Sequence, residues 1–306
     1  MNKTYFKEIK FTNFYRRLNI FSSILIILSI LIILLKGLNL GVDFKGGTLI
    51  EVRIENSSVN IAEIRQSLNK MNLGNINVKK FGKENDYLIK IQITKINDIN
   101  FIKSINEKMS SDLGSVVNFR RVENVGPKVS NELLKDGMLA ISLSLAAMLF
   151  YIWIRFEWQF SLAAIAAIIH DVIITIGIFS LLSFEVNLSI VAAVLTIVGY
   201  SMNDTVVIFD RIRENLKKYT KISISEISNT STNETLSRTL ITSVTTLLAL
   251  FSIYIFGGEI LRGFSFAMIV GVIVGTYSSI FVATPILNYT NVNSKTVLNE
   301  NSNEYI

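Results

Sequence analysis

Six long apolar stretches constrain what this sequence can fold into more than any other feature. They are Ile20–Leu35, Gly137–Ile154, Phe160–Leu182, Leu188–Phe209, Thr239–Phe256 and Phe264–Leu287. The hydrocarbon core of a bilayer is about 30 Å thick, so a helix needs roughly 20 apolar residues to cross it. In lipid, only a helix satisfies the backbone hydrogen bonds of a single segment within itself. The stretches therefore predict an α-helical membrane bundle of six transmembrane helices.

The composition agrees with a membrane protein and excludes several kinds of site. Half of the 306 residues are hydrophobic and 18% are charged, whereas a soluble domain carries about 25% charged residues. The first stretch follows Arg16 and Arg17, as a signal peptide would, but no A-x-A-like cleavage site comes after it, which favours an uncleaved anchor. There is no cysteine and only one histidine, His170. Disulfides, thiol catalysis and cysteine-based or all-histidine metal sites are thereby excluded, and no metal is predicted.

The positions of lysine and arginine predict the orientation in the membrane. If the N-terminus is cytoplasmic, thirteen of these residues lie in inside segments and one, Arg262, lies in the two short outside loops. The thirteen are Lys3, Lys7, Lys10, Arg16, Arg17, Arg155, Arg211, Arg213, Lys217, Lys218, Lys221, Arg238 and Lys295. The net charge of +6 is thus explained by orientation, and no nucleic-acid partner is predicted.

This orientation gives the domain organisation. The predicted parts are a cytoplasmic N-terminal segment 1–19, a first transmembrane helix 20–35, an extracytoplasmic (periplasmic) domain 36–136, a five-helix transmembrane region 137–287 with a cytoplasmic loop 210–238, and a cytoplasmic tail 288–306. A segment as long as 36–136 is translocated regardless of its charge, so its lysines do not contradict the assignment.

The segment 36–136 alternates between strand and helix patterns. Its predicted strands are Thr48–Ile54, Ile76–Phe81, Tyr87–Ile93 and Ser115–Val122, its predicted helices run from Ile61 to Met71 and from Ile99 to Met109, and a hairpin turn is predicted around Gly82–Asp86. In the first strand Ile50, Val52 and Ile54 share one face, as a half-buried strand requires. The order strand–helix–strand–strand–helix–strand predicts an α+β ferredoxin-like domain. This fold hosts many unrelated functions, so it assigns none here.

Ionisable side chains within the apolar stretches are the candidate functional residues, because burying a charge in lipid costs roughly 2.5–3.5 kcal/mol on insertion scales. Asp204 lies late in the fourth stretch, between Asn203 and Thr205, and His170 and Asp171 lie near the middle of the third. Asp204 and the His170–Asp171 pair each have two interpretations, a proton relay or structural hydrogen bonding between helices.

Arg238 opens the fifth stretch, where an arginine ordinarily extends to the interface and fixes the topology. It has a second interpretation, because lipid burial and a nearby arginine act in opposite directions on the proton affinity of a carboxyl group. A carboxyl group whose arginine approaches and withdraws could therefore take up and release protons.

The sixth stretch carries small residues at every fourth position. They are Ala267, Gly271, Gly275, Ser279 and Ala283. Such a stripe lets another helix approach closely, so we interpret it as a helix-packing seam.

Several longer motifs resemble the SecD/SecF protein-export family. They are Gly41–Thr48, Arg121–Lys128, the pair His170–Asp171, Gly199–Asn215, Thr235–Thr239 and Phe256–Phe264, of which the last four are similar to the SecF branch of the family. Together they span almost the whole chain and leave only the N-terminal basic segment and the tail after Leu287 without a match.

The resemblance implies an accessory subunit of the Sec machinery in the cytoplasmic (inner) membrane, in a superfamily that includes the resistance–nodulation–division exporters. It implies SecD, the SecYEG channel and often YajC and YidC as partners, with exported unfolded polypeptides as the cargo. Such proteins use the proton-motive force to aid late steps of export, with protons as the coupling ion and no cofactor. By the same resemblance Asp204 and Arg238 form the proton relay, while His170, Asp171, Asn203 and Thr205 are either relay or structural polar groups.

Three other functions stay open on the sequence. A proton-driven exporter of small molecules or lipids would share the architecture but usually carries two six-helix halves in one chain. A structural subunit without its own relay would not need Asp204 to titrate. An intramembrane aspartyl protease would need Asp171 and Asp204 in contact, yet their predicted depths differ by roughly 7 Å at 1.5 Å per residue. We therefore predict a transport subunit with no hydrolytic site.

Overall fold

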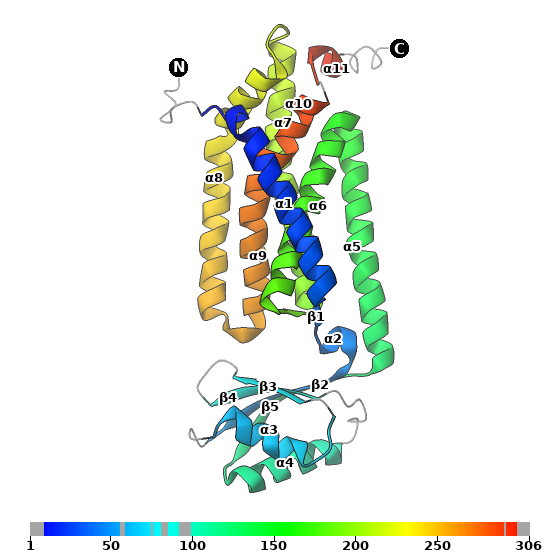
Figure 1. Cartoon of the computed structure of the whole chain (residues 1–306), viewed down its shortest axis with the longest axis vertical. Coiled ribbons are helices and arrows are strands. Elements are labelled where there is room, and N and C mark those ends of the chain that lie inside the picture. The colour runs from blue at the N-terminus through cyan, green and yellow to red at the C-terminus, as the bar shows by residue number, and fades with distance from the viewer. Residues whose placement is uncertain are drawn as a thin grey trace.

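The chain folds into a helical bundle with a smaller sheet domain at one end (Figure 1). The structure is a computed structural model and describes residues 9–55, 59–74, 76–80, 85–91, 99–290 and 292–298. Within them, six helices are long and apolar enough to cross a membrane. They are α1 (Thr12–Lys36), α5 (Pro127–Arg155), α6 (Trp158–Leu182), α7 (Leu188–Lys218), α8 (Ile224–Phe256) and a sixth span that joins α9 (Gly258–Ser278), the π-helix η1 (Ser279–Ala283) and α10 (Thr284–Tyr289). The predicted fold class is confirmed.

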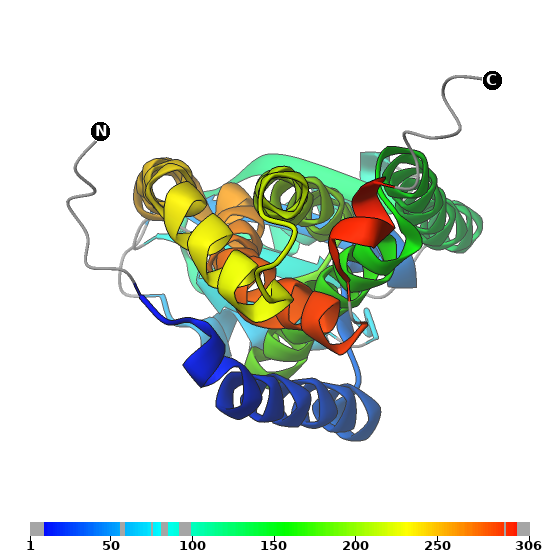
Figure 2. The same cartoon turned by 90° about the horizontal axis from the view of Figure 1, so that it is seen from above.

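Three of the six spans form the interior of the bundle and three surround it. In α6, α7 and the sixth span about half of the apolar window is buried (56%, 50% and 56%), against 11%, 6% and 17% in α1, α5 and α8. In the view from above, α1, α5 and α8 lie at the periphery (Figure 2). Their outward side chains are large and apolar, for example Leu34, Ile154 and Phe256. Apolar surface of this extent requires an apolar surrounding.

At the end of the bundle that carries both termini, the helices run past the predicted membrane boundaries. The predicted cytoplasmic loop 210–238 is helical over most of its length, because α7 continues to Lys218 and α8 starts at Ile224, which leaves only 219–223 between the two helices. Ser223 caps α8 by accepting a hydrogen bond from the amide of Glu226. Hydropathy detects only the apolar part of a helix, and these polar turns continue it outside the lipid. At the opposite end of the bundle, beside the sheet domain, α5 also starts earlier than predicted, at Pro127 and not at 137.

The sheet domain, residues 47–125, is a four-stranded antiparallel sheet with two helices on one face. Its elements are β2 (Gly47–Ile54), α3 (Ile61–Asn69), β3 (Ile76–Lys80), β4 (Asp86–Ile91), α4 (Ile99–Leu113) and β5 (Val117–Val125). The strand order β3-β4-β2-β5 is that of the ferredoxin-like fold. Ile50 of β2 pairs with Ile89 and Val122 and packs with Ile64 under the helices. The middle of the predicted hairpin turn, 82–84, lies outside the described residues.

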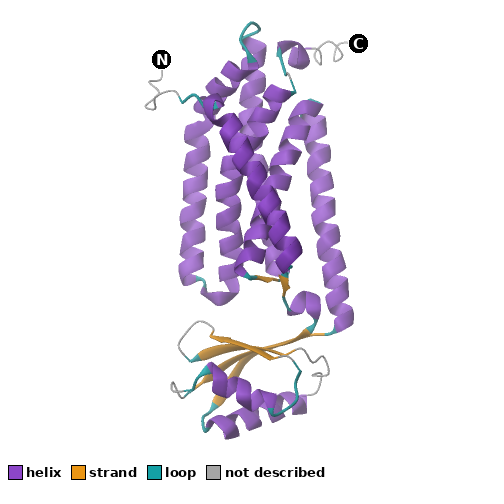
Figure 3. Cartoon of the chain, viewed as in Figure 1, coloured by secondary structure: helices purple, strands orange, loops and turns teal. Residues whose placement is uncertain are grey.

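The helices α3 and α4 cover the sheet face that points away from the bundle, so the other face points towards the bundle (Figure 3). Between sheet and bundle lie three short elements that the sequence did not predict. The strand β1 (Asn39–Leu40) pairs in parallel with β6 (Glu185–Val186), and α2 (Val42–Lys45) follows β1. Elements of two to four residues show no hydrophobic periodicity, and the pairing of β1 with β6 joins residues far apart in sequence.

The glycines of the Gly41–Thr48 motif make this connection possible. A Cβ on Gly41 would lie 2.7 Å from a carboxylate oxygen of Glu185, so only glycine allows β1 to approach β6 this closely. Gly46 and Gly47 have φ values of +74° and +131°, which glycine adopts without strain. They turn the chain from α2 into β2.

Two polar contacts join this region to the start of α7. Asp43 of α2 accepts a hydrogen bond of 2.9 Å from the amide of Leu188, the first residue of α7. Lys90 of β4 forms an ion pair with Glu185 in the turn before α7. The first contact holds α2, and the second holds the sheet domain itself, against the segment that joins α6 to α7.

Reversing the charge of Lys90 should free the sheet domain from this turn. Lys90→Glu and Glu185→Lys each place like charges together, whereas the double variant restores an attractive pair. A partly exposed pair contributes roughly 1 kcal/mol, so each single variant should broaden the distance distribution between spin labels on the sheet domain and on the bundle, and the double variant should narrow it again. The chain has no cysteine, so engineered labels are specific. Equal broadening in all three variants would contradict this role of the pair.

Candidate functional site

Asp204 lies buried in the half of the bundle nearer the termini, on the inner helix α7. Its side chain is 2% exposed. Within the described part of the chain, its Oδ2 atom has no hydrogen-bond partner. Two residues of α8 act on this carboxyl group, the hydroxyl group of Ser243 and the charge of Arg238, yet no ion pair joins Arg238 to Asp204 among the described residues. The carboxyl group is thus buried, incompletely satisfied and close to a cation that does not bind it.

Arg238 lies beside a polar cavity of about 570 Å³ between α5, α7 and α8. The cavity is also lined by Asn203, Asp210, Arg211 and Glu214. Asn203 and Arg238 are exposed, whereas Asp204, next to Asn203 in the sequence, is buried. On one side of α7 the polar cavity therefore reaches Asn203, the residue next to the buried Asp204.

The helix α8 presents a face of buried hydroxyl groups towards the interior. Thr235, Thr239 and Ser243 recur every fourth residue and are all buried. Among described residues the Oγ1 atom of Thr239 has no partner, while Ser243 shares a hydrogen bond of 2.7 Å with Thr276 of α9. No role was predicted for these hydroxyl groups from the sequence, although their i, i+4 spacing places them on one helix face.

Asp171 of α6 occupies a second buried site, and its hydrogen bonds there are complete. Its Oδ2 atom accepts hydrogen bonds from Ser201 of α7 at 2.5 Å and from Ser278 of α9 at 2.8 Å. Its Oδ1 atom lies 2.8 Å from Nδ1 of His170. Since three helices meet at one carboxyl group, Asp171 ties α6, α7 and α9 together.

His170 and Tyr277 extend this network to α1. The ring of Tyr277 stacks on that of His170 with centroids 6.0 Å apart, and its hydroxyl group hydrogen-bonds Ser22 of α1 at 2.8 Å. In the described structure Nε2 of His170 has no partner. The π-helix η1 starts directly after Ser278, and such π-turns inside helices frequently mark functional sites.

Two hydroxyl groups near Asp204 in the sequence have other partners. Ser201 binds Asp171, and Thr205 donates to the backbone oxygen of Ser201 at 3.1 Å. Asp171 and Asp204 share no hydrogen bond within the described part of the chain, so they do not form the proton-sharing pair that an aspartyl protease requires. In that same part, no group of three or more His, Asp or Glu side chains is placed to hold a metal ion.

The small-residue stripe of the sixth span faces α7 at Gly271 and Gly275. A Cβ on Gly271 would lie 2.3 Å from Ile197, and one on Gly275 would lie 3.0 Å from the Cβ of Ser201. Ala267 and Ala283 are fully buried, and Ser279 donates to the backbone oxygen of Thr276. The close approach at Gly275 brings α9 near the helix that carries both Ser201 and Asp204.

Fold and site together define a class of protein: a multi-pass membrane protein with buried ionisable groups in its bundle and a domain outside it. Two family models match the chain. The model described as "Protein export membrane protein SecD/SecF, C-terminal" matches residues 105–293, and the "SecD/SecF GG Motif" matches residues 31–57. The chain belongs to the SecD/SecF family, of which it is a SecF-type member of the inner membrane.

Curated relatives agree with this assignment. The "Protein translocase subunit SecF" of Rickettsia bellii is 44% identical over 281 residues, which are 92% of each chain. The protein of the same description from Desulfurispirillum indicum is 44% identical over 274 residues, 88% of this chain and 87% of that one.

Solved structures of SecDF match the whole architecture. The crystal structure of SecDF from Thermus thermophilus has a TM-score of 0.85 and 34% identity, and covers 95% of this chain. SecDF in a "Super-membrane-facing form" gives a TM-score of 0.69 and 32% identity over 99% of this chain. This chain spans 40% of the length of each of those SecDF chains.

The completeness of the Asp171 network predicts how it responds to substitution. Asp171→Leu should destabilise the bundle strongly, because the hydroxyl groups of Ser201 and Ser278 and Nδ1 of His170 would each lose a partner at roughly 1–3 kcal/mol. Ser278→Ala removes one bond and should cost about 1.5 kcal/mol, between the average for interhelical bonds in membranes and that for bonds to charged groups. Thermal unfolding in detergent measures both changes.

Ser252→Ala is the matched control, because Ser252 is exposed on α8 and bonds only its own helix at Leu248. A melting temperature that falls equally for Ser252→Ala and Ser278→Ala would show that the Asp171 network does not tie the helices together.

Proposed function

We propose that this chain is a subunit of the Sec protein translocase that works with SecD and uses the proton-motive force to drive late steps of protein export. Family membership and the SecDF structures support the translocase role. The observation that carries the coupling role is the buried Asp204. Among the described residues its Oδ2 atom has no hydrogen-bond partner, and Arg238, whose charge acts on it, lines a polar cavity and forms no ion pair with it.

In this proposal Asp204 takes up a proton when Arg238 is distant and releases it when Arg238 approaches. The sign follows from electrostatics, because a nearby cation stabilises the ionised carboxyl group and burial in lipid stabilises the neutral one. Thr239 and Ser243 offer hydroxyl groups beside the carboxyl group, and the cavity at Asn203 leads the proton to water. Protons are the coupling ion, and neither a cofactor nor a hydrolytic reaction belongs to this function.

The proposal also fixes the orientation and the partners. Both termini and the 219–223 turn lie in the cytoplasm and the sheet domain lies in the periplasm, because the short loops at the terminus end carry nearly all the loop lysines and arginines. Partners are SecD, the SecYEG channel, with YajC and YidC as further candidates, and exported unfolded polypeptides. The exposed apolar faces of α1, α5 and α8 contact lipid or the six helices of SecD.

Asp204→Asn should abolish the response to the proton gradient and spare assembly, because the amide preserves the shape but cannot exchange a proton. Export is measured in inverted vesicles after ATP is exhausted, with and without a gradient. The variant should export at the same rate in both conditions, namely the rate that the wild type shows without a gradient. Asp210→Asn is the matched control, since Asp210 lines the same cavity but is ion-paired with Arg155, and it should respond like the wild type.

Arg238→Lys separates charge from geometry. The lysine keeps the positive charge but loses the planar guanidinium group, so full activity would mean that charge alone is enough at this position.

A wild-type gradient response in Asp204→Asn would refute the relay and leave a structural subunit. Failure of the chain to co-purify with SecD and the channel would favour the exporter interpretation instead.

A further inference from the structure

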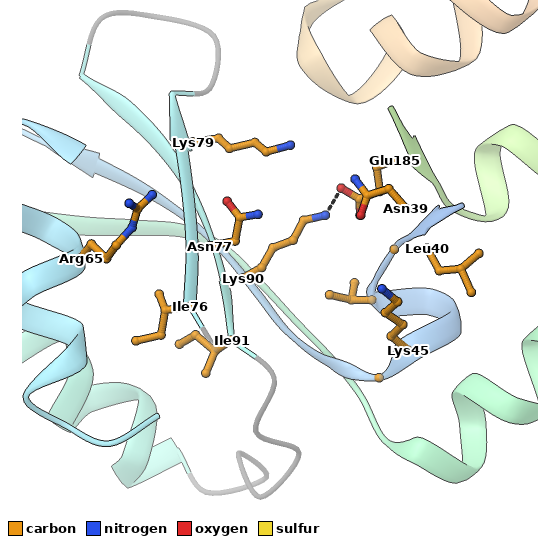
Figure 4. A pocket seen from close by; sticks show the side chains of 13 residues that line it. Asn39, Leu40, Lys45, Arg65, Ile76, Asn77, Lys79, Lys90, Ile91 and Glu185 are labelled. Carbon is orange, nitrogen blue, oxygen red and sulfur yellow. Dashed lines mark ion pairs between the residues drawn. The ribbon is translucent and has the colours of Figure 1, made fainter. Parts of the chain in front are cut away.

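A cleft of about 450 Å³ separates the sheet domain from the bundle. Its walls come from β1 and α2 on one side and from β3, β4 and α3 on the other, with Glu185 of β6 at its edge. Lys79 and Lys90 extend from the sheet into the cleft, and Lys45 faces them from α2 (Figure 4). The cleft lies where α1 and α6 end and α7 begins, which is the level of the lipid headgroups.

The cleft carries more positive charge than its own residues neutralise. Among the described residues, four basic side chains line it, Lys45, Arg65, Lys79 and Lys90, against one acidic side chain, Glu185. Lys90 is paired with Glu185, whereas Lys45, Arg65 and Lys79 have no ion pair with any described residue. Burial, the charge of Lys79 and more weakly that of Lys45 lower the pKa of Lys90 to about 8, against the opposing charge of Asp43. An anion in the cleft would relieve this repulsion.

An apolar cavity adjoins the cleft on the membrane side. Its volume is about 150 Å³, and it is lined by Leu38, Leu40 and Phe44 together with residues of α5, α6 and α7, such as Gly137 and Val191. Leu40 lines both spaces, so β1 is the wall between them. Because α5 is the least buried span, the cavity beside it stands at the lipid boundary.

We propose that the cleft binds the phosphate headgroup of an anionic membrane phospholipid, with one of its acyl chains in the apolar cavity beside α5. Lys45 and Lys79 bind the phosphate, and Asn39 and Asn77, which also line the cleft, supply hydrogen-bonding groups. The lipid then fills the space between sheet domain and membrane next to the Lys90–Glu185 pair. Basic charge alone would also suit a free phosphate or an acidic peptide, but neither would occupy the apolar cavity at the same level.

The test uses the full purified chain in detergent and native mass spectrometry with phosphatidylglycerol or phosphatidylcholine of identical acyl chains. The wild type should retain phosphatidylglycerol preferentially. Each lysine near a phosphate contributes about fivefold in affinity, so Lys45→Gln with Lys79→Gln should weaken phosphatidylglycerol binding about 25-fold. Lys80→Gln is the matched control, because Lys80 is exposed on the same strand but does not line the cleft.

A second variant tests the acyl chain. A Cβ at Gly137 would make only ordinary contacts with Val191, the nearer at 3.7 Å, and Gly137 lines the cavity, so we expect the longer side chain of Gly137→Leu to extend into it. It should weaken the binding of phosphatidylglycerol without changing the melting temperature of the lipid-free chain. Exposed Leu139→Phe is its control.

Three outcomes would overturn the proposal. Equal retention of the two lipids would show that the cleft does not recognise the anionic headgroup. Inorganic phosphate that raises the melting temperature as much as phosphatidylglycerol at the same concentration would assign the cleft to a free anion. Displacement of the lipid by a soluble acidic peptide, with Gly137→Leu binding the lipid normally, would assign it to a polypeptide.

Discussion

A carboxyl group inside a membrane bundle must find its hydrogen bonds among neighbouring helices, since lipid supplies none. Asp171 and Asp204 meet this constraint in opposite ways. Asp171 is bound by Ser201, Ser278 and His170, so it fixes the geometry of the inner helices. Within the described part of the chain, one oxygen of Asp204 has no hydrogen-bond partner, and Arg238, whose charge acts on it, forms no ion pair with it. A fully satisfied site resists change, whereas an incompletely satisfied one can respond to a proton or to a moving arginine.

The helix α7 relates this site to the sheet domain. It begins at Leu188, where Asp43 binds its first amide and Lys90 holds the preceding turn through Glu185, and Asp204 follows sixteen residues later, about 24 Å along the axis at 1.5 Å per residue. Ser201 and the close approach of Gly275 anchor the same helix to α6 and α9. A change in the protonation of Asp204 that shifts α7 would therefore also move the contacts of Asp43 and Lys90 at the start of this helix. Conversely, a movement of the sheet domain would shift α7 and so change the surroundings of Asp204.

The sequence predicted those parts of the structure that repeat along the chain. Alternation at Ile50, Val52 and Ile54 gave the sheet, and apolar length gave the six spans. Hydropathy could not find the polar helical turns beyond Phe209, nor the β1–β6 pairing, which brings together residues almost 150 positions apart. The partners of Asp171 were unpredictable for the same reason, since Ser278 lies 107 residues away. The helical period could have placed Thr239 and Ser243 on one face of α8. It could not have assigned them to this site, because threonine and serine in a membrane helix usually hydrogen-bond their own backbone, as Thr242 does here.

Proton coupling through this bundle requires Asp204 to change its protonation when a proton gradient is applied. Infrared difference spectroscopy of the protein in proteoliposomes, with aspartate labelled by ¹³C, measures this directly. We predict that applying the gradient changes the intensity of the carbonyl band of protonated aspartic acid, and that this change is absent in Asp204→Asn and retained in Asp210→Asn. A band that does not respond to the gradient, or one that survives in Asp204→Asn, would contradict the account.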